Sequence, residues 1–186
     1  MKLELIPGGK PERVTIEAIA FEPVSEPVPV DAIAFEEDTF LVLSADPVIR
    51  PVREDPLRLL TGILELVPNE PGAVMVHAGR PPRILAVVHD LARDPTTRLE
   101  WVREAYRGIF AEAKRAGFRR LSVPLLGTVH GRLPKDGVVR ELIAAVPEAK
   151  AAGVTHVFVL VAEGEIDATI ALLDQASTSP ASSTTP

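Results

Sequence analysis

The stretch from Arg120 to Ala162 is the part of the sequence that most limits what this chain can fold into. An apolar run over Arg120–Leu125 is followed by a loop with two glycines, by a helical apolar pattern that begins at Pro134, and by a second apolar run over Thr155–Ala162. At this spacing, strand, loop, helix and strand form a right-handed βαβ crossover between two parallel strands. The sequence therefore predicts a sheet that is at least partly parallel.

Further apolar or alternating runs predict more strands around this crossover. They lie at Leu3–Ile6, Arg13–Ala20, Val30–Phe35, Thr39–Ser44, Gly72–Ala78 and Ile84–His89. Ile84–His89 is almost continuously apolar, as expected of a strand that is buried on both faces. The acidic residues Glu36, Glu37 and Asp38 separate two of the runs, and a solvated turn is more typical of them than a general base or a ligand-binding group. The proline-rich stretch 21–29 is interpreted as a loop.

Helical spacing of apolar residues predicts helices between these strands. The pattern from Leu99 to Ala113 is the clearest, with Thr97 and Glu100 spaced as a capping box and Gly117 placed as the C-cap. Asp55 and Pro56 favour the start of an earlier helix that ends near Pro68, and a last helix is expected from Glu165 to about Ala176. Six or so mixed strands between two helical layers would cover both faces of the sheet, with Val74, Val87, Leu121, Val123, Val157 and Val159 central.

Composition excludes several function classes. The 186 residues include 20 Lys and Arg against 26 Asp and Glu, which gives a net charge of −6 and argues against electrostatic binding of duplex nucleic acid. No apolar run is long enough to cross a membrane and the first residues lack a signal-peptide pattern, so we expect a cytoplasmic protein. The chain has no Cys, and no two His have the spacing of a helical metal site, so neither a metal nor a cofactor is expected. Few thermolabile residues and 18 Pro are typical both of a heat-adapted protein and of a proline-tolerant lineage.

One loop combines the features of an anion site. Between the predicted strand and the helix at Pro134 stand Gly127, Thr128, Val129, His130, Gly131 and Arg132. Ligands of open α/β sheets bind beyond the carboxyl ends of the strands, near helix N-termini whose N–H groups can hold an anion. The two glycines permit such a nest, while His130 and Arg132 can add positive charge. A simpler interpretation is that both glycines only serve a tight turn.

His89, at a strand end, is a further candidate for a ligand or catalytic role.

The order of segments resembles one known family, the macro domain. Val30–Ile33 resembles the opening of that family's Val-Asp-Ala-Ile-Val-Asn-Ala-Ala-Asn strand, and Pro71–Val76 with Arg83–His89 is similar to its paired central strands. Leu99–Ala116 followed by Gly117–Thr128 resembles the family's helix, strand and second phosphate loop. The resemblance covers roughly residues 13 to 175. It implies a three-layer α/β/α sandwich with a mixed, largely parallel sheet that binds ADP-ribose at the strand ends, and in some branches hydrolyses ADP-ribosyl bonds.

The sequence departs from this family's pattern where the ligand would bind. Counted from Val30, the two Asn of the family's strand fall on Phe35 and Asp38, and Val129 stands where the second phosphate loop has glycine. The first phosphate loop, a run of glycines, has no counterpart in the stretch 45–51, where Pro residues remove N–H donors. We therefore expect a single macro-like domain over residues 1–176, followed by a disordered tail over 177–186.

Two functions follow from these matches and departures. The first is a module that binds ADP-ribose or a related nucleotide or phosphate ligand weakly, without hydrolase activity, using the loop Gly127–Arg132 and Asp38. The second is a macro-like fold that has lost its ligand and acts as an interaction or assembly protein. A hydrolase of ADP-ribosyl bonds ranks third, because Asp38 is the only matched acid.

Overall fold

A seven-stranded mixed sheet organises the chain, as seen in a computed structural model that describes residues 13–43 and 67–178. Its strands are β1 (Val14–Ile16), β2 (Ile19–Val24), β3 (Ala32–Asp38), β4 (Val74–His77), β5 (Arg83–His89), β6 (Arg120–Pro124) and β7 (His156–Leu160). Their order across the sheet is β1-β2-β7-β6-β3-β5-β4. The outermost pair at each edge is antiparallel and the pairs between them are parallel.

The predicted βαβ crossover is confirmed. Strand β6 pairs with β7 in parallel, and the chain passes between them through α3 (Lys135–Ala144) and α4 (Val146–Ala151). Parallel pairing brings the carboxyl ends of β3, β5, β6 and β7 to the same edge of the sheet, so the loops that follow them share one side of the molecule.

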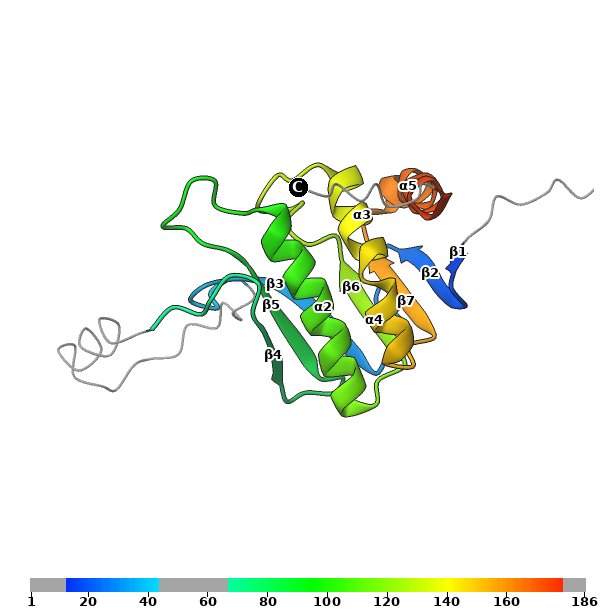
Figure 1. The fold of residues 1–186 in the computed structure, drawn as a ribbon, viewed down its shortest axis with the longest axis horizontal. Coiled ribbons are helices and arrows are strands. Elements are labelled where there is room, and N and C mark those ends of the chain that lie inside the picture. The colour runs from blue at the N-terminus through cyan, green and yellow to red at the C-terminus, as the bar shows by residue number, and fades with distance from the viewer. Residues whose placement is uncertain (1–12, 44–66, 179–186) are drawn as a thin grey trace, which may run out of the picture.

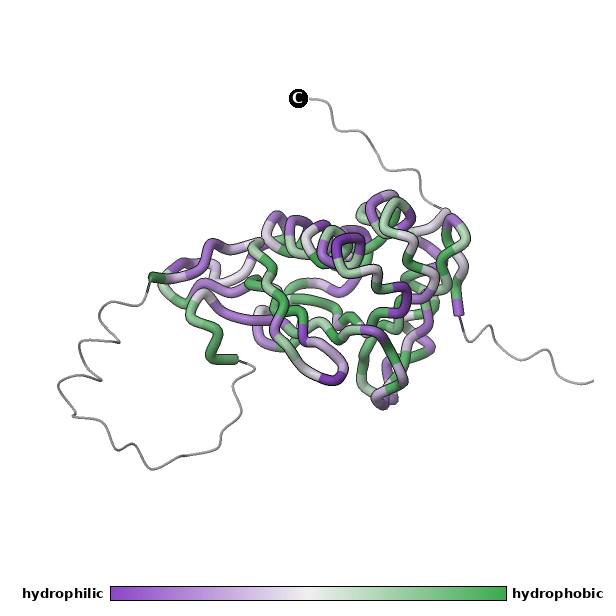
Figure 2. The backbone as a smooth tube through the Cα atoms, turned by 90° about the horizontal axis from the view of Figure 1, so that it is seen from below, coloured by the Kyte–Doolittle hydropathy of each residue, from purple (hydrophilic) through white to green (hydrophobic). Residues whose placement is uncertain are grey.

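The described helices pack against the sheet through an apolar core. Helix α2 (Leu99–Ala116) crosses in front of the sheet beside α3 and α4, as Figure 1 shows, and α5 (Ile166–Thr178) follows the short 3-10 helix η1 (Glu163–Glu165) near β1 and β2. The perpendicular view of Figure 2 shows helical turns along one side of largely hydrophobic strands. The predicted stripe of α2 is buried, with Tyr106, Ile109 and Phe110 fully enclosed, and Gly117 ends the helix with φ +74°.

Several sequence predictions are corrected by the structure. Glu36, Glu37 and Asp38 do not form a solvated turn: they continue β3, and Glu37 and Asp38 are buried. Strand β2 occupies 19–24, part of which the sequence indicated as a loop. Val74 lies on the edge strand β4, whereas the other five residues predicted as central are fully buried.

The predicted capping box is also wrong. Arg98, not Thr97, is the N-cap of α2, and no side chain caps that end of the helix. The Thr97 hydroxyl instead donates to the Val88 carbonyl at 2.7 Å. Thr97 therefore joins the end of β5 to the start of α2.

Some predictions fall on parts of the chain that the structure does not describe. The expected strand at 3–6, most of the helix at 55–68 and residues 179–186 of the tail lie outside the described ranges. Helix α5 extends to Thr178. Within the described ranges, none of the helices combines the length and the hydropathy needed to cross a bilayer.

Tyr106 connects the helical layer to the loop that follows β6. Its hydroxyl donates to the Pro124 carbonyl and accepts from the Leu126 N–H, each at 3.1 Å. The side chain is fully buried, and burial raises the pKa of this phenol, so it remains neutral. One hydroxyl group therefore holds the backbone on both sides of the point where β6 ends.

We predict that Tyr106→Phe lowers the free energy of unfolding by about 1–3 kcal/mol, because it removes the hydroxyl that partners the buried Leu126 N–H and the Pro124 carbonyl. Denaturant unfolding followed by circular dichroism measures the change. Ser177→Ala, which removes an exposed hydroxyl bonded to the Asp174 carbonyl, is the control and should change stability little. Equal stability of Tyr106→Phe and the unmodified chain would contradict this role.

Candidate anion site

The loop after β6 contains two residues with left-handed backbone conformation. Gly127 takes φ +74° and Arg132 φ +55°, both in the left-handed region. The Leu133 N–H donates to the Gly127 carbonyl at 3.0 Å and closes the loop. This closure directs the N–H groups of Gly127 and His130 toward the sheet, where they meet a side chain from β3.

That side chain is Glu36, a residue that the sequence placed in a turn. Its Oε2 accepts the Gly127 N–H at 2.7 Å, and its Oε1 accepts the His130 N–H at 3.4 Å. The side chain is only 9% exposed. The loop therefore holds an anion in this structure, and the anion is the protein's own carboxylate.

Two histidines complete the surroundings of Glu36. The Nε2 atoms of His89 and His130 each lie 3.6 Å from Glu36 Oε1, and the two rings meet edge to face. His89 is buried, whereas half of the His130 side chain is exposed. Within the part of the chain that is described, His89 Nε2 has no hydrogen-bond partner, and Glu36 Oε1 lies just beyond that range. Both imidazoles thus face the same carboxylate, that of Glu36.

This environment keeps Glu36 ionised. Burial by itself would raise the pKa of the carboxyl, but the neighbouring His89 ring, the Gly127 N–H and the charge that His130 can carry favour the ionised form. The net effect is a pKa below the ordinary value of 4.5. At neutral pH the loop therefore encloses a full negative charge.

The other predicted loop residues have different surroundings. Thr128 is turned back on the strand, because its N–H and its hydroxyl both donate to the Leu125 carbonyl. Val129 and Arg132 are exposed. A Cβ at Gly131 would lie 2.1 Å from Thr97 Cγ2, so this position needs glycine for close packing. Gly131 is thus placed by its packing against Thr97, while the N–H groups of Gly127 and His130 contact the Glu36 carboxylate.

Asp38 lies at the end of the same strand but serves its own turn. Its Oδ1 accepts the Phe40 N–H at 2.6 Å and its Oδ2 accepts the Val42 N–H at 3.2 Å. The residue is almost fully buried. Both carboxylate oxygens are therefore committed to the backbone, and the structure does not direct Asp38 at the loop after β6.

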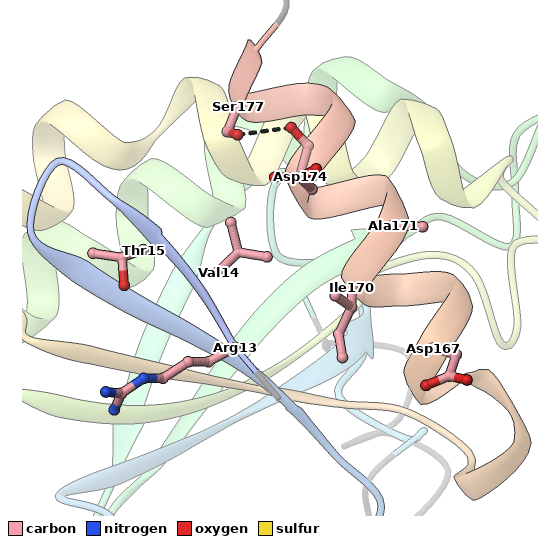
Figure 3. A pocket seen from close by; sticks show the side chains of 8 residues that line it. All are labelled: Arg13, Val14, Thr15, Asp167, Ile170, Ala171, Asp174 and Ser177. Carbon is pink, nitrogen blue, oxygen red and sulfur yellow. Dashed lines mark hydrogen bonds between the residues drawn. The ribbon is translucent and has the colours of Figure 1, made fainter. Parts of the chain in front are cut away.

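A separate pocket of about 510 Å³ lies between β1 and α5. Figure 3 shows its lining, which consists of Arg13, Val14, Thr15, Asp167, Ile170, Ala171, Asp174 and Ser177. It includes none of the residues that the sequence singled out. In the described residues, no group of three or more His, Asp and Glu side chains is arranged to hold a metal ion.

Comparison with solved structures identifies the fold. A macrodomain variant from Oceanobacillus iheyensis superposes with a TM-score of 0.65 at 15% identity, covering 91% of this chain and 96% of that chain. A Trypanosoma brucei macrodomain in complex with ADP superposes with a TM-score of 0.56 at 18% identity, covering 90% of this chain and 78% of that chain. The DarG macrodomain of Thermus aquaticus superposes with a TM-score of 0.54 at 19% identity, covering 76% of this chain and 97% of that chain. The chain therefore has the macrodomain α/β/α fold, as the order of its motifs predicted.

Comparisons at the level of sequence identify no relative. No model of a known protein family matches the chain, and no curated protein matches it. At 14–19% identity to the solved macrodomains, the likeness concerns the fold. Function must therefore be argued from the chain's own residues.

Glu36, Thr97 and Tyr106 are the site residues that sequence reasoning missed. A signal for Glu36 was present, because strand periodicity places Ala32, Ala34 and Glu36 on one face. A carboxylate that continues a face of small apolar residues needs donors from the layer above it. For Thr97 and Tyr106 no comparable signal exists, because their partners are backbone groups, 9 residues away for Thr97 and 18 and 20 residues away for Tyr106.

We predict that Glu36→Gln lowers the free energy of unfolding at pH 7 by about 1–3 kcal/mol, because charge-assisted bonds in a buried setting are lost. Since the folded pKa is depressed, the ionised carboxylate adds stability above about pH 4.5, and this stability is lost as the pH falls through the folded value. The difference in the free energy of unfolding between Glu36→Gln and the unmodified chain should therefore become smaller as the pH falls.

Denaturant unfolding at a series of pH values from 7 to 3 measures this difference in the free energy of unfolding. Glu163→Gln, at an exposed position in η1, is the control and should track the unmodified chain throughout. If the free energy of unfolding of Glu36→Gln differed from that of the unmodified chain by the same amount over this whole pH range, the loop would not favour the ionised carboxyl.

Proposed function

We propose that this chain is a divergent macrodomain that binds ADP-ribose or a related nucleotide-like anion weakly through the loop Leu126–Leu133, without hydrolase activity. The observation that carries the proposal is the convergence of the Gly127 and His130 N–H groups on one carboxylate. Backbone donors that enclose a carboxylate oxygen are equally suited to a phosphate oxygen. The solved macrodomains that share this fold include one with ADPR and others with ADP.

The weak affinity follows from the donors that the site lacks. Asp38, at the position of an Asn in the family's strand, uses both carboxylate oxygens within its own turn and offers no amide. The Thr128 N–H is already bonded to Leu125. The Gly127 and His130 N–H groups are engaged by Glu36, and each charge-assisted bond that is not formed to a ligand phosphate costs about 1.5–3 kcal/mol.

The proposal that hydrolysis is absent rests on the same residues. A hydrolase needs a group that holds or activates water beside the ligand. Asp38 accepts two backbone N–H groups, and Glu36 is enclosed by the loop and the histidines. Neither carboxylate has an oxygen directed at an open ligand site.

A second candidate function is that of an interaction protein. Large apolar side chains are exposed after the carboxyl ends of three neighbouring strands: Phe40 and Val42 follow β3, Leu91 follows β5 and Val129 follows β6. Exposed apolar groups gathered at one edge are typical of contact surfaces. This function would replace the first one if the loop binds no nucleotide.

We predict that the unmodified chain binds ADP-ribose more weakly than the micromolar range, and that His130→Ala and Arg132→Ala each weaken binding a further two- to tenfold or so, because each removes positive charge beside the loop. Titration calorimetry measures both effects.

Matched controls are His77→Ala, at the end of β4, and Arg115→Ala, at the end of α2. Both remove the same residue types far from the loop and should leave the affinity unchanged. Affinities for His130→Ala and Arg132→Ala that equal those of the controls would place the ligand elsewhere.

A further inference from the structure

Glu36 stands in the position that an incoming anion needs. We infer that Glu36 is an intramolecular competitor for the anion site, and that a phosphate-bearing ligand binds only when the Glu36 carboxylate leaves the N–H groups of Gly127 and His130. The inference rests on the proposed function, since it concerns the same loop. It goes further by naming the residue that sets the affinity of the site.

The first step is that the two occupants share their donors. In the described structure of the loop, Thr128 donates both its N–H and its hydroxyl to Leu125, and Leu133 donates to Gly127. The N–H groups of Gly127 and His130 are the ones that point at Glu36, at 2.7 and 3.4 Å. A phosphate oxygen that accepts these two N–H groups displaces the Glu36 carboxylate from them, so on these donors the ligand and Glu36 exclude each other.

The second step concerns charge. Glu36 is ionised and enclosed, and a phosphate placed on the same donors would lie within a few ångströms of it in a setting with little water to screen the repulsion. His89 and His130 face Glu36 Oε1 from β5 and from the loop. Once the carboxylate has moved away, both imidazoles face the phosphate in its place. The histidines can therefore serve either occupant, but not both.

The third step concerns the class of ligand. A free carboxylate offers the loop no more than Glu36 already does, and Glu36 has the advantage of being tethered to β3. A phosphate or diphosphate carries more charge and more acceptor oxygens than a carboxylate. We therefore assign the site to phosphate esters and diphosphates, with Glu36 as the residue that keeps weaker anions out.

The test compares the unmodified chain with Glu36→Gln, which keeps the shape of the side chain and removes its charge. The probes are inorganic pyrophosphate and ADP-ribose, each titrated by calorimetry. If Glu36 occupies the loop for about nine-tenths of the time or more, its removal raises the affinity for pyrophosphate about tenfold or more. Glu36→Ala, which removes the competing group entirely, should show at least the same gain.

Glu163→Gln is the matched control, because it makes the same change at an exposed position in η1 and should bind as the unmodified chain does. Thermal unfolding of each variant establishes that the protein tested is folded. A folded Glu36→Gln or Glu36→Ala protein that binds pyrophosphate no better than the unmodified chain, or that does not bind it, overturns the inference.

The two probes separate this inference from the proposed function. A gain in pyrophosphate binding with no ADP-ribose binding by any variant supports the competitor role of Glu36 and contradicts the proposed ligand. ADP-ribose binding that is equal in the unmodified chain and Glu36→Gln, with no gain for pyrophosphate, supports the proposed function and contradicts the competitor role.

Discussion

The interaction on which the candidate site depends is the hydrogen bond from the Gly127 N–H to the Glu36 carboxylate, 2.7 Å long and shielded from water. It joins the end of β3 to the loop that follows β6. This hydrogen bond also affects how tightly the loop could hold a ligand, because N–H groups that already have a partner contribute less binding free energy than free N–H groups do. The loop and the carboxylate that its N–H groups hold are thus encoded in one chain.

The surrounding fold keeps this contact in place. Tyr106, from the buried face of α2, holds the backbone where β6 ends, and Thr97 binds Val88 at the end of β5 while its methyl group packs where Gly131 has no side chain. The parallel pairing of β3 with β5 and β6 brings the three strand ends together. The macrodomain fold therefore positions the loop, and the Glu36 carboxylate lies against its N–H groups.

The sequence predicted the fold better than the site, for a physical reason. Strand and helix periodicity are local, so the βαβ crossover and the extent of α2 could be inferred from spacing alone. The partners of Glu36 lie about 90 residues away, as the separation of 91 to Gly127 shows. Three adjacent acids predict a solvated turn unless the donors that neutralise them are known. The loop itself could be proposed as a site from the sequence because its glycines and basic residues are adjacent in the chain.

The most direct test of this account is a pH titration of the Gly127 amide by ¹H–¹⁵N NMR. An N–H that donates to an ionised carboxylate senses its protonation, so the Gly127 resonance of the unmodified chain should shift in acid, with a midpoint below the ordinary glutamate value of 4.5. In Glu36→Gln the same resonance should be insensitive over that range. A Gly127 amide that behaves alike in both proteins would show that Glu36 does not occupy the loop in solution.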